Sequence, residues 1–562
     1  MEKNKTKNLL VVLLLIQLFS FQSNAQVASP NSWVIYFSDK GNSNFSFATP
    51  ADYLSSRAIS RRQTHQIAVD SMDLPVHQAY IDSVVARGFQ LLNKSKWLNA
   101  ISVYSADSTL PATLSGLPFV NQVVNVKIKL NGQAPIEKWQ EETSVTKNFI
   151  QPIHAPQNSF AYGPSLRQIN MLQGDLLHQG GYRGEGMLIA VIDGGFWNVN
   201  ANPAFDSLMQ SGRLLSTWDF VSRNNNVFDD NNHGALVLST MAANMPGMLV
   251  GTAPYAEYLL LRSEDVDTEY LIEEFNWVCA AEYADSAGAD IINSSLGYTT
   301  FDNPAMNWIY DDMDGNTSIA SKGAFQASQK GLLVVNSAGN SGASPWYYIG
   351  APADAKDILA VGAVDSMEVI TGFSSRGPSF DGRVKPDVAA MGRDVVLANN
   401  GGGIQTGNGT SFASPILAGM AACLWQSDPS LSNLQLRQAI LESCDQYANP
   451  DFEKGYGIPD FSLAFTVLNG KNLQQPNETM LVSVGPNPTL SYTDINFFSK
   501  DTQTIEVKLF DLFGKLLQEK NLFYKGNSYN GIRLNIENLE AGIYVVKVIG
   551  KGVETTQKIV KQ

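Results

Sequence analysis

The chain has 562 residues, 44% of them apolar, and a formal net charge of −14 at pH 7. Its length allows roughly three or four domains with sizeable cores, and the acidic balance argues against binding nucleic acid or anionic lipid through charge. The three cysteines, Cys279, Cys423 and Cys444, are too few for a disulfide framework. One bond between Cys423 and Cys444 is conceivable, but we expect all three to be small buried apolar side chains.

The N-terminus has the three-part pattern of a secretory signal peptide. Lys3, Lys5 and Lys7 precede an apolar run at 9–21, and small residues follow at 23–25. This pattern predicts a signal peptide over 1–25, with cleavage after Ala25. A membrane anchor is the alternative, but the run is shorter than the ~20 residues that a span needs. We therefore expect export and no stable membrane span.

Residues 26–150 are expected to form a separate α+β domain. The apolar patterns predict helices and strands in mixed order, followed by a polar, proline-containing stretch from residue 137 onward that is typical of an exposed linker, assigned to 151–164. The predicted strands lie at 33–37, 89–93, 100–105 and 121–130, and the predicted helices at 54–62, 76–87 and 110–117.

The central region, 165–470, alternates short continuous apolar runs with helical patterns. Such runs suit strands buried on both faces, and their alternation with helices predicts an α/β domain with a mostly parallel sheet. Functional sites in open parallel sheets gather beyond the carboxyl ends of the strands, so the polar residues that end these runs are candidates. The runs lie at 187–193, 258–262, 289–297, 331–340 and 358–364.

The last part of the chain changes to a β-rich pattern. The segment IEVKLF at 505–510 alternates with period two, and GIYVVKVI at 542–549 is a second strand-like run. Turn residues lie between them, which predicts a small antiparallel β-sandwich domain over 481–562. Residues 471–480 are the predicted linker before it.

Four polar residues stand at element ends where catalytic groups are useful. Asp193 ends a strand and could orient a histidine, and His233 stands at a helix entrance, where a base is held rigidly. Asn340 follows a strand, and its amide could donate to an oxyanion. Ser411 precedes a helical pattern whose N-terminus favours negative charge. Taken singly, each is also an ordinary turn or helix-cap residue.

The chain order Asp, His, Asn, Ser resembles that of the subtilisin-like serine peptidases. The resemblance implies a three-layer α/β domain and an acyl-enzyme mechanism of peptide-bond hydrolysis. The matching segments are VIDGG at 191–195, HGALV at 233–237, GTAP at 251–254, DIINSSLG at 290–297, NSAGN at 336–340, SSRGP at 374–378, KPDVAA at 385–390, GTSFASP at 409–415 and GYGIPD at 455–460.

The resemblance also implies a role for each residue. Ser411 would be the nucleophile, His233 its general base and acid, and Asp193 the group that holds His233. The Asn340 amide and the Ser411 N–H would form the oxyanion hole. Two further sets would bind substrate: the backbone of Ser295, Leu296 and Gly297 as an added strand, and the pocket for the residue before the cut, lined by Ser337, Ala338 and Gly339.

No cofactor is required for this chemistry, and no metal ligands are assigned. Exported relatives commonly bind structural calcium, so the resemblance admits a calcium ion. The acidic run DDMDGNTS at 311–318 offers oxygen ligands, but it lacks the remaining ligands of an EF-hand loop. A solvated acidic turn is the preferred interpretation of this run.

Two positions depart from the pattern of the resemblance. Gly194 stands where Thr or Ser is usual, and Ala235 stands where a threonine is usual. Neither change removes a catalytic atom, although a hydroxyl near His233 is lost. The competing hypothesis is a catalytically inactive secreted scaffold used for binding or adhesion, which predicts an eroded catalytic set. This chain keeps all four residues.

The flanking domains fit the same resemblance. Residues 26–150 suit an inhibitory prodomain removed by self-cleavage, with an unrelated accessory domain as the alternative. The C-terminal domain resembles the sorting domain of the type IX secretion system, and a carbohydrate- or polymer-binding module is its alternative. We expect protein or peptide substrates, the outer-membrane secretion machinery as a partner, and a secreted or cell-surface location. The carrying segments of the sorting resemblance lie at 485–489, 511–515, 539–548 and 558–562.

Overall fold

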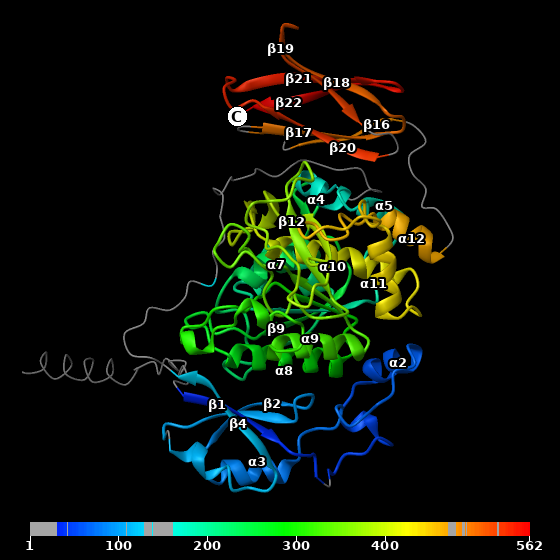
Figure 1. Ribbon diagram of the computed structural model, residues 1–562. Coiled ribbons are helices and arrows are strands. Elements are labelled where there is room, and N and C mark those ends of the chain that lie inside the picture. The colour runs from blue at the N-terminus through cyan, green and yellow to red at the C-terminus, as the bar shows by residue number, and fades with distance from the viewer. Residues whose placement is uncertain are drawn as a thin grey trace, which may run out of the picture.

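The computed structural model describes residues 31–41, 43–107, 109–128, 138, 161–469, 479–485, 489, 492–524 and 528–561. The predicted signal peptide and most of both predicted linkers lie outside the described residues. Three folded parts follow one another along the chain, with the N-terminal and C-terminal domains at opposite ends of a larger central domain (Figure 1).

The N-terminal domain is a four-stranded antiparallel sheet with helices beside it, as predicted. The two faces of the sheet have different partners, because successive strand residues point to opposite sides. Trp33 and Ile35 pack in the domain's own core, whereas Val34 packs in a cluster with the central domain. The elements are β1 Asn31–Phe37, α2 Ser56–Thr64, α3 Gln78–Val85, β2 Gln90–Ser95, β3 Ala100–Tyr104 and β4 Val120–Ile128, in sheet order β2-β3-β1-β4.

The helix predicted at 110–117 is shorter than expected. Only a 3₁₀ turn forms, over Leu110–Thr113. Ser115 and Gly116 follow it, and both are poorer helix formers than alanine. The other predicted elements of this domain are present, within a few residues of their expected ends.

A seven-stranded parallel sheet forms the centre of the molecule. All five predicted runs are strands of this sheet, and their residues are nearly all buried. The sequence patterns do not predict the two edge strands, β6 and β13. β6 is half-exposed and lacks a continuous apolar run, and two of the four residues of β13 are alanines, which are poor strand formers. The sheet order is β13 Val388–Met391, β12 Leu359–Val364, β11 Leu333–Ser337, β10 Ile291–Ser294, β5 Leu188–Asp193, β9 Glu257–Arg262, β6 Leu214–Asp219.

Helices cover both faces of this sheet and complete three layers. The helices α7 His233–Ala242 and α10 Thr410–Gln426 share one apolar cluster with one face, and α8 Ile272–Ala287 and α9 Ile319–Gln329 share another with the opposite face. The remaining elements are α4 Leu166–Asn170, α5 Gly174–Gln179, α6 Asp206–Gln210, β7 Asn244–Met245, β8 Leu249–Val250, β14 Val395–Ala398, β15 Ile404–Gly407, α11 Asn433–Glu442 and α12 Phe461–Asn469.

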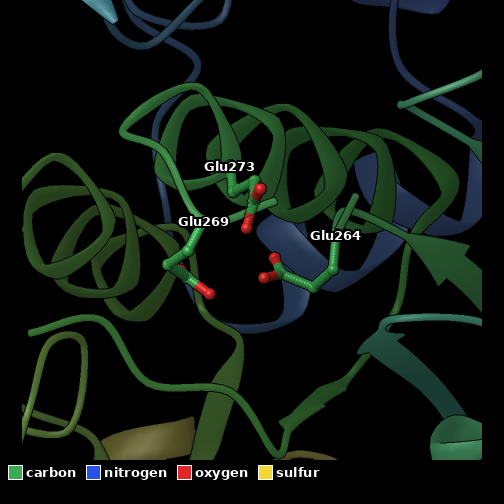
Figure 2. Close-up of side chains that lie close together, drawn as sticks. All are labelled: Glu264, Glu269 and Glu273. Atoms are coloured by element: carbon green, nitrogen blue, oxygen red, sulfur yellow. The ribbon is translucent and has the colours of Figure 1, made fainter. Parts of the chain in front are cut away.

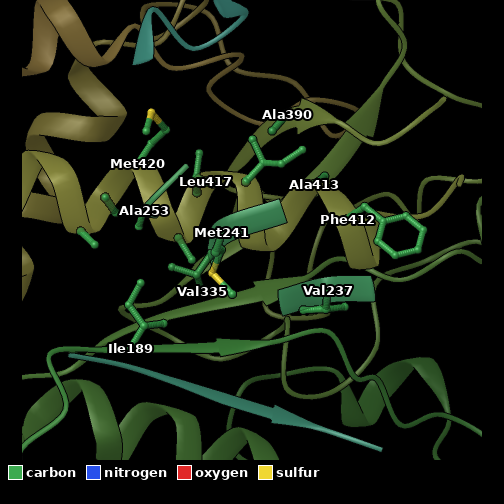
Figure 3. Packing of buried hydrophobic residues seen from close by; sticks show 14 of the residues in the cluster. Ile189, Val237, Met241, Ala253, Val335, Ala390, Phe412, Ala413, Leu417 and Met420 are labelled. Atoms are coloured by element: carbon green, nitrogen blue, oxygen red, sulfur yellow. The ribbon is translucent and has the colours of Figure 1, made fainter. Parts of the chain in front are cut away.

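Helix α10 is almost completely buried, and small residues make this possible. Figure 3 shows Ala413, Leu417 and Met420 of this helix among residues of α7 and the sheet. A methyl group on Gly419 would lie 2.0 Å from Thr252 Oγ1, so only glycine allows this approach. Pro415 lies inside the helix and cannot donate to the Ser411 carbonyl one turn earlier. That carbonyl accepts from Ser295 Oγ instead, at 2.8 Å.

The C-terminal domain is the predicted antiparallel sandwich. One sheet has the order β16-β17-β20 and the other β19-β18-β21-β22, all pairs being antiparallel. Ile495, Phe497, Val507 and Val546 are among the residues buried between them. The strands are β16 Met480–Gly485, β17 Tyr492–Ser499, β18 Gln503–Asp511, β19 Leu516–Tyr524, β20 Ser528–Asn535, β21 Gly542–Gly550 and β22 Val553–Lys561.

Two further features bear on the predictions from sequence. All three cysteines are buried with free thiols, so the conceivable bond between Cys423 and Cys444 is not formed. Among the described residues, no helix is both long enough and apolar enough to cross a membrane.

Candidate active site

The side chains of Asp193 and His233 meet beyond the carboxyl end of β5. His233 Nδ1 lies 2.7 Å from Asp193 Oδ1, and because an ionised carboxylate only accepts hydrogen bonds, Nδ1–H is the donor. Both residues are buried. The Gly194 N–H also donates to Asp193 Oδ1, at 2.7 Å, and His233 N–H donates to Asn231 Oδ1 at 2.7 Å. This arrangement fixes the proton on Nδ1, so Nε2 is the nitrogen able to act as a base.

Ser411 is the second residue of α10, and the start of this helix lies beside the start of α7. The ring of Phe412 lies 6.2 Å from the imidazole of His233, centroid to centroid. Ser295 Oγ donates to the Ser411 carbonyl at 2.8 Å, and Ser414 Oγ donates to Asn293 Oδ1 at 2.9 Å. The first turn of α10 is therefore tied to the end of β10, which positions Ser411 on a rigid element.

Asn340 is held by the residue that precedes Ser411. Its Oδ1 accepts hydrogen bonds from both N–H and Oγ1–H of Thr410, each at 2.9 Å. With the carbonyl oxygen engaged, the amide nitrogen is the group that can donate to a bound oxyanion. Gly339 precedes it with φ of +102°, in the left-handed region, and its N–H donates to Thr410 Oγ1. The loop after β11 therefore depends on a glycine here.

One cleft of about 640 Å³ gathers most of the predicted site. It is lined by Ser411 and Asn340 and by both sets of predicted substrate-binding residues, Ser295, Leu296, Gly297, Ser337, Ala338 and Gly339. Asp193 and His233 do not line it and are connected to it through the start of α10. In the described part of the chain, no backbone hydrogen bond uses the N–H or carbonyl of Gly297, so this edge is open to an added strand.

Two kinds of residue were missed by sequence reasoning. Asn336 Nδ2 donates to the carbonyls of Leu296 and Ser337 and so joins the two walls of the cleft. Lys138, Glu264 and Glu269 also line the cleft. Glu264 follows β9 within two residues, so the rule that sites lie beyond strand ends could have found it. No local signal could have found Lys138, which was expected in an exposed linker and instead has a side chain only 4% exposed.

The acidic run 311–318 has the contacts of a hydrogen-bonded turn. Asp314 Oδ1 accepts from the N–H groups of Asn316 and Thr317, and Asp312 Oδ2 accepts from Ile309 N–H. Among the described residues, these carboxylates do not belong to a group of three converging acidic or histidine ligands. Within the described part of the chain, this run therefore does not bring three such ligands together, and bound structural calcium stays a prediction.

Comparison with known proteins divides the chain into three matches. Residues 32–144 match the peptidase S8 propeptide domain of Bacteroidota, residues 184–457 match the subtilase family, and residues 483–562 match the secretion system C-terminal sorting domain. Each match falls on one of the three folded parts. The third assigns the C-terminal domain to type IX secretion, which directs the protein to the cell surface or the extracellular space.

Curated relatives align with the central domain. A thermophilic serine proteinase of Bacillus sp. strain AK1 is 32% identical over 274 residues, covering 48% of this chain and 60% of that protein. Subtilisin E of Bacillus subtilis strain 168 is 31% identical over 310 residues, covering 54% and 71%. The subtilisin of Bacillus pumilus is 31% identical over 295 residues, covering 52% and 94%. The chain thus spans less than two thirds of the first relative and nearly all of the last.

Proposed function

Because the chain belongs to the subtilase family, we propose that it is a secreted serine endopeptidase with Asp193, His233 and Ser411 as its catalytic triad. The observation that carries this proposal is the buried hydrogen bond of 2.7 Å between Asp193 and His233, beside the helix start that bears Ser411. The Gly194 departure leaves this arrangement intact, since Gly194 contacts Asp193 through its backbone N–H.

In the proposed mechanism, His233 Nε2 takes the proton of Ser411 Oγ as this oxygen attacks the scissile carbonyl. The Asn340 amide and the Ser411 N–H donate to the oxyanion, helped by the partial positive charge at the start of α10. The protonated imidazole, stabilised by Asp193, then gives its proton to the leaving amine. The acyl group remains on Ser411 until water, activated by the same histidine, releases the acid.

We propose further that the N-terminal domain is the inhibitory prodomain and that the chain is cut within the predicted linker, 151–164. The match to the propeptide domain supports this proposal. The position of Lys138 also supports it, because Lys138 lines the same cleft as Ser411. The sorting domain fits passage through the outer membrane, with protein or peptide substrates met outside the cell. The alternative of an inactive scaffold is disfavoured because every group needed for the chemistry is present.

The test compares peptide cleavage by the secreted wild-type protein with that of Ser411→Ala and Asn340→Ala. We expect Ser411→Ala to abolish cleavage and Asn340→Ala to lower kcat by roughly 10²–10³-fold, a magnitude measured in subtilisin itself. Ser427→Ala, at the far end of the same helix, is the matched control and should keep wild-type activity. A folded, processed wild-type protein that cuts no peptide would favour the inactive scaffold.

A further inference from the structure

Three buried glutamates converge beside the cleft that Ser411 lines, and two of them, Glu264 and Glu269, are part of its lining. Glu264 follows β9, Glu269 lies in the loop before α8, and Glu273 lies in the first turn of α8. Their exposed fractions are 2%, 7% and 0%, and ligand oxygens of the three lie within 4.8 Å of one another. Figure 2 shows the three carboxylates turned toward a common point. We call this group the glutamate pocket.

The glutamate pocket is occupied by the ammonium group of Lys138. Lys138 Nζ lies 3.3 Å from Glu264 Oε2 and 3.2 Å from Glu269 Oε2, and it also pairs with Glu273 Oε2. Burial alone lowers the pKa of Lys138, but the three carboxylates together outweigh burial and raise it. The side chain is thus held as a cation. It comes from the stretch between the N-terminal and central domains.

The pocket has capacity for more donors than a lysine supplies. Glu264 Oε1 is held by Tyr298 Oη at 2.6 Å and Ser263 Oγ at 3.0 Å. The Oε1 atoms of Glu269 and Glu273 are buried and have no hydrogen-bond partner within the described ranges. Buried acceptors without partners are costly, and buried charges need an opposite charge. When Lys138 leaves, the pocket therefore needs another cationic donor or must take up protons.

The place of the pocket in the cleft indicates where such a cation comes from. Glu264 and Glu269 line the same cleft as Ser411 and the open edge at Gly297. Lys138 precedes every bond in the proposed cut region, so its side chain lies on the acyl side of the scissile bond. A peptide laid along the cleft in the same direction would place one of its own side chains in the pocket.

We propose that Glu264, Glu269 and Glu273 form a specificity pocket that selects a lysine or arginine side chain on the acyl side of the scissile bond. Lys138 is the intramolecular occupant of this pocket before the N-terminal domain is removed. The proposal rests on the proposed peptidase function and names one element of its substrate. Arginine suits the pocket as well as lysine, because its guanidinium offers five donors to the unpartnered oxygens.

The first test is a peptide library in which each position before the cut carries lysine, arginine, norleucine or glutamate. For the processed wild-type enzyme we expect kcat/KM to favour lysine and arginine over norleucine by roughly 10–100-fold at one position, as for hydrogen bonds to charged groups. Glu269→Gln and the double variant Glu269→Gln/Glu273→Gln should lose this preference while still cutting the norleucine peptide. Glu442→Gln, which removes an exposed carboxylate on α11, should retain it.

Equal cleavage of the lysine and norleucine peptides by the wild type refutes the pocket and leaves the peptidase function standing. A wild-type protein that cuts no peptide refutes both. If calcium binds the processed wild type but not the double variant, and the two peptides are cut alike, the pocket is a metal site and the proposal is wrong.

A second measurement does not depend on activity. We expect trypsin to cut the full-length Ser411→Ala protein after Lys138 at least about 10-fold more slowly than the same protein that also carries Glu269→Gln/Glu273→Gln. In the glutamine variant, release of Lys138 from the pocket costs less free energy, so the bond is exposed more often. Mass spectrometry measures this cut relative to cuts elsewhere in the chain. Equal rates in both proteins would refute occupation of the pocket by Lys138.

Discussion

Replacement of Glu282 by alanine should loosen the N-terminal domain from the central one. Glu282 projects from α8, is 6% exposed, and accepts three hydrogen bonds from the turn between β2 and β3. The donors are Ser95 Oγ, Lys96 N–H at 2.7 Å and Trp97 N–H at 3.0 Å. Alanine leaves all three donors without their acceptor in a buried interface.

The magnitude follows from the number of donors. Each buried donor left unsatisfied costs about 1–3 kcal/mol, and water entering the space left by the carboxylate recovers part of the loss. A net weakening of about 2–4 kcal/mol is therefore expected, which corresponds to roughly a 30- to 1000-fold larger population of the opened interface. Glu257→Ala is the matched control. It removes the ion pair with Arg57 at the edge of the same interface, where both side chains are about one third exposed, and should cost less than about 1 kcal/mol.

Hydrogen exchange in the full-length Ser411→Ala background measures this opening directly. Amides of β2 and β3 should exchange about 30- to 1000-fold faster in Glu282→Ala, while amides of the central sheet should be unchanged. Unaltered exchange in β2 and β3 would refute the inference that the hydrogen bonds of Glu282 hold this interface closed. If Glu257→Ala accelerated exchange in β2 and β3 as much as Glu282→Ala, the effect would come from loss of any carboxylate at the interface and not from the three hydrogen bonds of Glu282.

Three further predictions concern the same molecule. Burial raises the pKa of Glu282 to about 7, against the opposing effect of Lys96. The closed interface therefore binds the Glu282 proton more tightly than the opened one. The resulting stabilisation of the closed interface is fully present below about pH 4.5 and is lost as the pH rises through 7. Exchange of β2 amides, corrected for intrinsic rates, should be slower at pH 5 than at pH 8, and Glu282→Gln should flatten the difference. Gly419→Ala should lower stability by about 1–3 kcal/mol through overpacking against Thr252, seen as a lower Tm; Gly116→Ala, where an added methyl group meets nothing within 4 Å, should leave Tm unchanged. The three buried thiols should resist iodoacetamide in the native protein and react after unfolding, because burial raises the pKa of each; modification of native Cys423 would contradict its packing in the core.

Much of the central domain could be predicted because its signals are local. The strands buried on both faces, such as β5 and β11, are continuous apolar runs, and the candidate site residues stand at the ends of these runs. The edge strand β6 escaped prediction because its outer position tolerates polar side chains, and Ser216 and Thr217 interrupt its apolar run.

The glutamate pocket could not be predicted for a different reason. Lys138 pairs with Glu264, 126 positions away, and its burial is tolerable only because three carboxylates from distant positions surround it. From the sequence alone, a lysine in a polar, proline-containing stretch is expected to be solvated until those partners are known. The same holds for Asn336, whose amide donates to the carbonyl of Leu296, 40 positions away. Such contacts are properties of the tertiary fold and leave no periodic trace in the sequence.

The N-terminal sheet has two apolar faces but only one helix layer of its own. Its second face, which includes Val34, Ala100 and Val126, is completed by residues of the central domain. If the two domains separate, the side chains on that face are exposed to water and lose their contacts with the central domain. If the N-terminal domain is cut free, we therefore expect it to be less stable than in the intact chain and more readily digested when it unfolds. Because the central domain supplies part of its apolar packing, the N-terminal domain depends on the intact chain for its full stability.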